Sequence, residues 1–231
     1  MRIETLFLDA GGVVVHPNWE RVAEALGRQG VHVEARTLFA ADLRAKHDLD
    51  RPANARAASD DARTAQHFAC VLDHAGLTRG PAVDAALAEV RRFHAERNIW
   101  EWVPDDVPPA LERLRGLGLP LVMVSNANGT LHAHLERLGI AHFFDVVLDS
   151  YVEGVEKPDP LIFRRALERS HARPETTLHV GDLYNVDILG ARAAGIEAWL
   201  LDAADLYGGI DCERVRSLDE LADRLGQRLR R

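Results

Sequence analysis

Apolar residues follow two different patterns along the chain, and the change between them divides the sequence. Residues 3–9 predict a strand, because the apolar run Leu6-Phe7-Leu8 within them is typical of a buried parallel strand. From Trp19 to about Arg97 the apolar positions recur at rough helical spacing, in a sequence rich in Ala, Arg, Asp and Leu. This stretch predicts four helices, at Trp19–Gln29, Glu34–Leu49, Asp60–Ala75 and Ala82–Arg97.

Beyond Val103, short apolar runs alternate with helical segments. The runs predict strands at Leu119–Val124, Phe144–Leu148, Thr177–Val180 and Ile196–Leu201. The segments beside them predict helices at Pro108–Leu117, Thr130–Leu138, Pro160–Ser170 and Val186–Ala194, and a last one from a Ser217 capping box to about Leu229. Such alternation indicates a parallel sheet with helices on both faces. We therefore predict an α/β fold: a Rossmann-like, doubly wound parallel sheet core from residues 1–16 and 103–231, with a four-helix-bundle-like cap inserted at 17–102.

Composition narrows the class of function. The chain has 231 residues with ordinary hydrophobic content, and its net charge of −8 argues against a nucleic-acid or anionic-membrane binder. No signal peptide and no apolar span of about 18 residues is evident. Cys70 and Cys212 are far apart and lack metal-ligand spacing, which indicates reduced thiols. We expect a cytoplasmic protein, monomeric or homodimeric, that acts on a small molecule.

Polar residues follow four of the apolar runs. They are Asp9, Ser125-Asn126, Lys157, and Gly181-Asp182 with the nearby Asp187. The carboxyl edge of a parallel sheet is where open α/β folds bind ligands. Gly11 and Gly12 follow Asp9, and glycine lets the backbone turn sharply and approach a ligand. From this first stretch alone, Asp9 is either a covalent nucleophile or a capping residue at a strand-to-turn junction.

In this order the motifs resemble those of the haloacid dehalogenase-like hydrolase superfamily, in the subgroup with an α-helical cap after the first motif. The segments Gly154–Pro160 (GVEKPDP) and Gly181–Ala191 (GDLYNVDILGA) carry the resemblance most clearly. It implies a phosphatase in which Asp9 attacks phosphorus and becomes an aspartyl-phosphate. It also implies Mg²⁺ bound by Asp9, the main-chain carbonyl of Gly11 and Asp182, with Asp187 acting through water or orienting the other ligands.

The resemblance also assigns the residues that would bind a small phosphorylated metabolite. Ser125 and the backbone of Asn126 would donate hydrogen bonds to phosphate oxygens, beside the Gly11-Gly12 turn. Lys157 would neutralise Asp9 and the transferring group. The catalytic residues implied are therefore Asp9, Ser125 and Lys157.

Gly11 departs from the family's usual first motif, which has a second Asp at this position. That Asp protonates the leaving oxygen and later activates water, assistance worth about 10²–10⁴-fold. Three explanations stay open. The substrate could have a good leaving group, such as a sugar 1-phosphate or an acyl phosphate; a neighbour such as His16 could substitute; or the reaction is not phosphate hydrolysis.

The last explanation has three forms. A metal-independent 2-haloacid dehalogenase would use Asp9 to attack carbon, but such enzymes usually lose the Asp that follows Gly181 here. A phosphonate-cleaving enzyme needs a Schiff-base lysine in the cap, where Lys46 is the only lysine. A weakly active relative could bind a phosphometabolite or a protein without turnover. Retention of Asp182 and Asp187 favours the Mg²⁺-dependent phosphatase.

Overall fold

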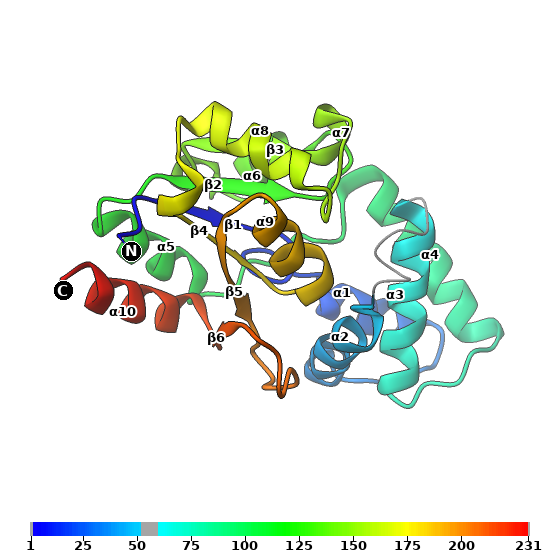
Figure 1. The fold of residues 1–231 in the computed structure, drawn as a ribbon. Coiled ribbons are helices and arrows are strands. Elements are labelled where there is room, and N and C mark those ends of the chain that lie inside the picture. The colour runs from blue at the N-terminus through cyan, green and yellow to red at the C-terminus, as the bar shows by residue number, and fades with distance from the viewer. Residues whose placement is uncertain (1, 52–59, 231) are drawn as a thin grey trace. The chain divides into compact units, whose positions relative to one another are not determined.

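The chain forms two compact units in the computed structural model, which describes residues 2–51 and 60–230 (Figure 1). One unit runs to Val15 and resumes at Val103; the other spans His16–Trp102. His16, which we expected in the sheet unit, groups with the helical unit because its backbone pairs with Trp102. The His16 amide donates to the Trp102 carbonyl at 2.8 Å, and the Trp102 amide donates to the His16 carbonyl at 3.1 Å.

The first unit is built on a six-stranded sheet in which every neighbouring pair is parallel. Its strands are β1 (Thr5–Leu8), β2 (Leu121–Ser125), β3 (Val146–Asp149), β4 (Thr177–Gly181), β5 (Glu197–Leu201) and β6 (Glu213–Val215). The order β3-β2-β1-β4-β5-β6 places β1 between β2 and β4. The predicted Rossmann-like α/β class is confirmed. The edge strand β6 was missed because two of its three residues are charged, so it presents no apolar run.

Helices cover both faces of this sheet (Figure 1). They are α5 (Val107–Gly116), α6 (Leu131–Arg137), α7 (Ser150–Glu153), α8 (Pro160–Ser170), α9 (Leu189–Ala193) and α10 (Leu218–Leu229), with short turns η1 (Ala141–Phe143), η2 (Pro174–Thr176) and η3 (Tyr184–Ile188). Phe163 of α8 and Ala191 of α9 pack with Phe7, Val122 and Leu200 in one buried apolar cluster. Helices α5 and α10 pack against each other. Burial of apolar side chains on both faces stabilises a parallel sheet.

The second unit holds the helices α1 (Trp19–Arg28), α2 (Ala35–Leu49), α3 (Asp60–His74) and α4 (Pro81–Arg97). Each contributes apolar residues to one core, for example Leu26, Leu38, Val71 and Leu87. The helical spacing that predicted these helices is therefore the spacing of their buried faces. Among the helices that the structure describes, none is long and apolar enough to cross a membrane.

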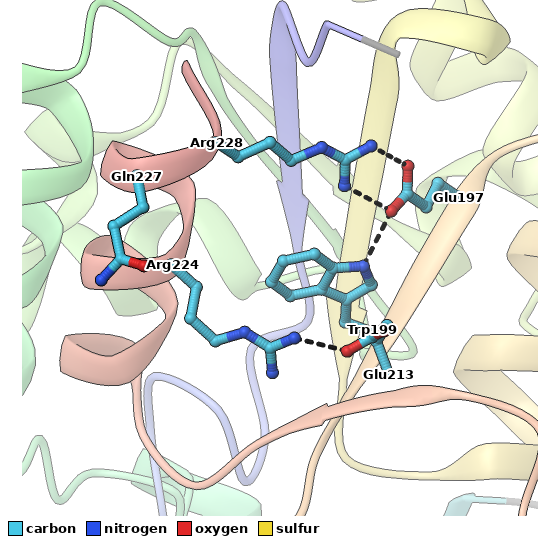
Figure 2. A pocket seen from close by; sticks show the side chains of 6 residues that line it. All are labelled: Glu197, Trp199, Glu213, Arg224, Gln227 and Arg228. Carbon is cyan, nitrogen blue, oxygen red and sulfur yellow. Dashed lines mark hydrogen bonds and ion pairs between the residues drawn. The ribbon is translucent and has the colours of Figure 1, made fainter. Parts of the chain in front are cut away.

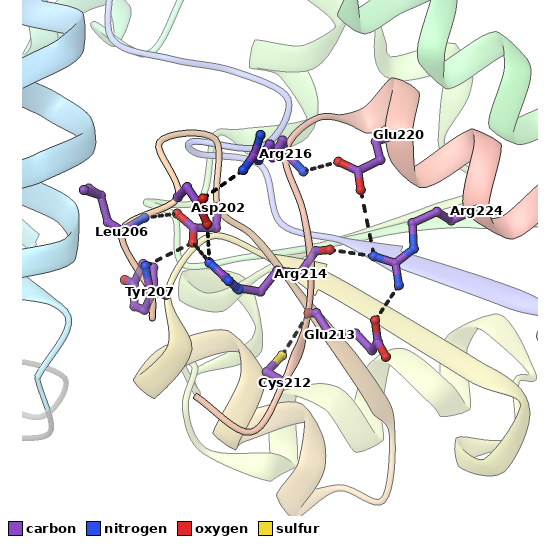
Figure 3. A network of polar contacts seen from close by, with 10 residues as sticks. Asp202, Leu206, Tyr207, Cys212, Glu213, Arg214, Arg216, Glu220 and Arg224 are labelled. Carbon is purple, nitrogen blue, oxygen red and sulfur yellow. Dashed lines mark hydrogen bonds and ion pairs between the residues drawn. The ribbon is translucent and has the colours of Figure 1, made fainter. Parts of the chain in front are cut away.

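Charged residues close the β5–β6 end of the sheet against α10. Arg228 binds both carboxylate oxygens of Glu197, at 2.6 and 2.9 Å, and the Arg224 guanidinium lies over the Trp199 ring (Figure 2). In the loop after β5, Asp202 accepts hydrogen bonds from the amides of Leu206 and Tyr207 and from Arg214 (Figure 3). These arginines are engaged with carboxylates, so we assign the region to stability.

Candidate active site

Asp9 stands at the end of the central strand. The amide of Asp9 donates to the Val180 carbonyl of β4 at 3.0 Å, so its position is set by the neighbouring strand. The next residues turn back, because the Ala10 carbonyl accepts from the Val14 and Val15 amides, each at 2.9 Å. Gly12 has a φ of 84°, a conformation that favours glycine, and its amide donates to the Val15 carbonyl at 2.8 Å. The Gly12 amide is thus engaged within the turn that follows the carboxylate.

The end of β4 supplies two more carboxylates. Asp182 follows Gly181 directly, and Asp187 lies on the π-helical turn η3. Such turns are rare and are frequent at functional sites. The Leu183 amide donates to Asp187 Oδ2 at 3.0 Å, and this bond fixes the carboxylate. A Cβ atom at Gly181 would overlap the Asp187 side chain, so only glycine lets this loop close around the buried acid.

Lys157 joins the two strand ends through its side chain. Its Nζ lies 2.7 Å from Asp9 Oδ1 and 2.7 Å from Asp187 Oδ1, and the residue is 2% exposed. The backbone of Lys157 is held by the Asn126 side chain, which accepts from the Lys157 amide at 2.8 Å and donates to its carbonyl at 3.0 Å. We expected Asn126 to act through its backbone; the structure shows in addition a side chain that positions Lys157.

The carboxylates of Asp9, Asp182 and Asp187 form a buried acidic cluster, with oxygen atoms within 4.8 Å of one another. Burial raises the pKa of Asp9, and the attraction of Lys157 only partly opposes it. Burial by itself would lower the pKa of Lys157, but Asp187 and Asp9 outweigh it and hold that pKa above its usual range. Burial would likewise raise the pKa of Asp187, but Lys157 and His179 hold it below the usual range.

This arrangement fits a divalent cation. The cluster holds three buried carboxylates, and Lys157 contacts two of them, Asp9 and Asp187. The raised pKa of Asp9 reports the cost of ionising it there. The donors are all oxygen atoms, which Mg²⁺ prefers. The cluster could therefore hold Mg²⁺ and would gain charge balance from it.

Ser125 ends β2 at the same edge of the sheet. The β1–β2 register pairs Leu8 with Met123, which puts Ser125 and Asp9 just beyond paired positions. Ser125 is 5% exposed and is paired in register with Asp149. Asp149 was missed by sequence reasoning: its Oδ2 accepts from the Gly129 amide at 2.8 Å and so holds the loop after Ser125. Its place directly after the predicted strand 144–148 is the signal that could have found it.

A family model described as haloacid dehalogenase-like hydrolase matches residues 3–195. The chain belongs to this family of hydrolases. Its sequence is 35% identical over 127 residues to the haloacid dehalogenase-like hydrolase domain-containing protein 3 of Homo sapiens, covering 55% of this chain and 50% of that protein. It is 37% identical over 132 residues to a glyceraldehyde 3-phosphate phosphatase of Methanopyrus kandleri, covering 57% and 56%. The chain therefore spans about half the length of these curated relatives.

Solved structures share the fold of this HAD-type hydrolase. A HAD hydrolase of Bacillus subtilis, bound to magnesium, has a TM-score of 0.68 at 21% identity, over 97% of this chain and 99% of that one. The L-2-haloacid dehalogenase of Xanthobacter autotrophicus has a TM-score of 0.61 at 20% identity, over 97% and 98%. Because a magnesium-bound hydrolase and a haloacid dehalogenase share this fold, the fold alone does not show which reaction this chain catalyses. That question has to be answered from the site residues.

Proposed function

We propose that this HAD-type hydrolase is a Mg²⁺-dependent phosphomonoesterase that uses Asp9 as its nucleophile on a small phosphorylated metabolite. The observation that carries the proposal is the cluster of Asp9, Asp182 and Asp187 at one edge of the sheet, two of whose carboxylates, Asp9 and Asp187, contact Lys157. The similarity to a glyceraldehyde 3-phosphate phosphatase supports the same reaction class. We further propose a cytoplasmic monomer or homodimer, in keeping with the free thiols of Cys70 and Cys212.

In the proposed reaction an Asp9 carboxylate oxygen attacks phosphorus while the bond between phosphorus and the ester oxygen breaks. The alcohol leaves with a proton taken from solvent, and an aspartyl-phosphate remains. Water then attacks the same phosphorus, phosphate departs and the Asp9 carboxylate is restored. Ser125 and the backbone of Asn126 would donate hydrogen bonds to the phosphoryl oxygens.

Lys157 serves this chemistry by staying charged. Its pKa is held above the usual range by the two carboxylates it contacts, so the ammonium persists at neutral pH. A fixed cation beside Asp9 stabilises charge that develops on the transferring group. The Asn126 side chain keeps that cation in place through both backbone atoms of Lys157 that it binds.

The residues that would hold Mg²⁺ are Asp9, Asp182 and the carbonyl of Gly11, with Asp187 orienting them. Bound there, the ion would neutralise charge on the phosphoryl oxygens. Asp187 Oδ2 is already fixed by the Leu183 amide and Oδ1 by Lys157, which suits an orienting role.

Gly11 leaves the site without the family's second acid. His16 does not replace it, because burial and the nearby Lys46 lower the pKa of His16 to about 3 against the opposing Asp42. Its ring is therefore neutral at pH 7 and has no readily released proton. We propose a substrate whose leaving group needs little protonation, such as a sugar 1-phosphate or an acyl phosphate.

The test is phosphate release from a panel of phosphate esters and acyl phosphates, with and without Mg²⁺. We expect turnover that requires Mg²⁺, that Asp9→Asn abolishes, and that the exposed-site control Asp84→Asn retains. Metal-independent release of halide from 2-haloacids would overturn the proposal in favour of dehalogenation. Mg²⁺-assisted binding of a phosphometabolite without turnover, measured by calorimetry, would overturn it in favour of a binding protein.

A further inference from the structure

The helical unit contains a second group of metal-binding side chains. Asp48 lies in the last turn of α2, and Cys70 and His74 lie four residues apart near the end of α3. Residues at this spacing share one helix face. The carboxylate, thiol and imidazole each offer an atom within 4.8 Å of the other two. None of these residues belongs to the proposed catalytic machinery.

Hydrogen bonds already join two histidines to Asp48. His74 Nε2 lies 2.9 Å from Asp48 Oδ2, and His47 Nδ1 lies 3.4 Å from Asp48 Oδ1. The helices that carry them are packed through buried apolar residues, including Ala45 of α2 and Val71 of α3. The backbone positions of the candidate ligands are thus set by the core and not by the cluster itself.

We propose that Asp48, Cys70 and His74 bind a zinc ion, with the fourth position taken by water. Carboxylate, thiolate and imidazole are all common zinc ligands. The charges of a thiolate and a carboxylate balance the two charges of the ion, so no uncompensated charge remains. The thiol loses its proton to solvent as the sulfur–zinc bond forms.

The spacing of the ligand atoms is close to what zinc requires. Zinc bonds of about 2.0–2.3 Å in a tetrahedron hold ligand atoms roughly 3.3–3.8 Å apart. The three atoms lie within 4.8 Å of one another, so they need to close by no more than about 1.5 Å. His74 and Asp48, now in hydrogen-bond contact, would separate slightly to admit the ion. Side-chain rotations of this size need no movement of either helix.

Cobalt titration of the full chain tests the site directly. Co²⁺ substitutes for zinc, and a bound thiolate gives a sulfur-to-cobalt charge-transfer band that an oxygen site cannot give. The titration is run on chelator-treated protein with excess Mg²⁺, which would occupy the carboxylate cluster at Asp9. We expect one equivalent of Co²⁺ to produce the band, and Zn²⁺ to displace it.

Two variants and one control decide the outcome. Cys70→Ser should abolish the band, and His74→Gln should weaken Co²⁺ binding at least about tenfold. Cys212→Ser removes the other cysteine, in the sheet unit, and should bind as the natural chain does. Zinc should also raise the melting temperature of the natural chain and not that of Cys70→Ser. Absence of the band in the natural chain, its survival in Cys70→Ser, or its loss in Cys212→Ser would each overturn the proposal.

Discussion

Replacing Lys157 with Met tests the electrostatic account of the site. The substitution keeps an unbranched side chain one atom shorter but removes the cation that lies 2.7 Å from both Asp9 and Asp187. At an effective dielectric constant of about 20, each contact corresponds to roughly 6 kcal/mol of attraction before desolvation is subtracted. Breaking a buried ion pair by removing one partner costs about 3–5 kcal/mol in practice, and we expect that loss of unfolding free energy at pH 7.

The deficit should depend on pH in a defined direction. Without Lys157, burial and Asp187 keep the folded-state pKa of Asp9 above its unfolded value. The folded variant then binds more protons than the unfolded chain, so its stability falls as pH rises through that pKa. The loss should therefore be smaller at pH 5 than at pH 7. Excess Mg²⁺ should recover part of it at pH 7, if the carboxylates bind the ion.

Guanidinium unfolding followed by circular dichroism, at both pH values and with and without Mg²⁺, measures these differences. The matched control is Arg79→Met, which removes a cation from the exposed ion pair with Asp84 and should leave stability unchanged. Phosphatase activity of Lys157→Met should fall at least about 10²–10³-fold. A variant as stable as the natural chain at pH 7 would refute the argument that Lys157 neutralises the buried carboxylates.

Three further changes probe the supports of the site. Gly181→Ala should weaken Mg²⁺ binding and lower stability because its Cβ would overlap Asp187. The control Gly208→Ala should change neither property, because a Cβ there has no atom within 4 Å. Calorimetry measures Mg²⁺ binding and melting curves measure stability. Asn126→Ala should lower kcat by up to about 10²-fold with a smaller effect on KM, because it frees the backbone of Lys157. His16→Phe should reduce the loss of unfolding free energy between pH 7 and pH 5. In the natural chain the folded pKa of His16 is about 3, so only the unfolded chain takes up the proton in this range, which costs about 2 kcal/mol.

Elements with a strong local pattern were predictable from the sequence. Buried strands such as β1 and β2 coincide with apolar runs in the sequence. Asp159-Pro160 predicts the start of α8, and the Asp159 side chain caps that helix by accepting from the Leu161 amide at 2.9 Å. The strand β6 has no such pattern in its sequence. It is a strand because it pairs with β5. The segment of η3 was predicted as the start of an ordinary helix, but it forms a π-helical turn. The buried Asp187 carboxylate binds the Leu183 amide there, and this contact cannot be inferred from local helix propensity.

The candidate site was predictable in its residue types and not in its connections. Strand-end positions pointed to Asp9 and Asp182 because parallel strands end at a common edge. The prediction that Lys157 also follows a strand end was wrong, because β3 ends at Asp149 and Lys157 lies between α7 and α8. The contact of Asn126 with the Lys157 backbone joins residues 31 apart in sequence, and two of the amides that Asp149 binds, those of Gly129 and Leu131, lie 20 and 18 residues before it. The hydrophobic periodicity of the sequence cannot predict such pairs, because they depend on the order of the strands in the sheet.

An aspartate at position 11 would restore the acid that Gly11 lacks. The positive φ of this turn falls on Gly12, at 84°, so an aspartate at position 11 acquires no left-handed strain. If the missing acid limits the rate, Gly11→Asp should raise kcat on alkyl phosphates by as much as about 10²-fold and leave acyl phosphates unchanged, because only an alkoxide leaving group needs the proton. Gly12→Asp, which forces an aspartate into the strained position, is the matched control and should lose stability without any gain. A folded Gly11→Asp variant with no gain on alkyl phosphates would show that the rate is limited elsewhere, and the inference of a substrate with a good leaving group would then lose its basis.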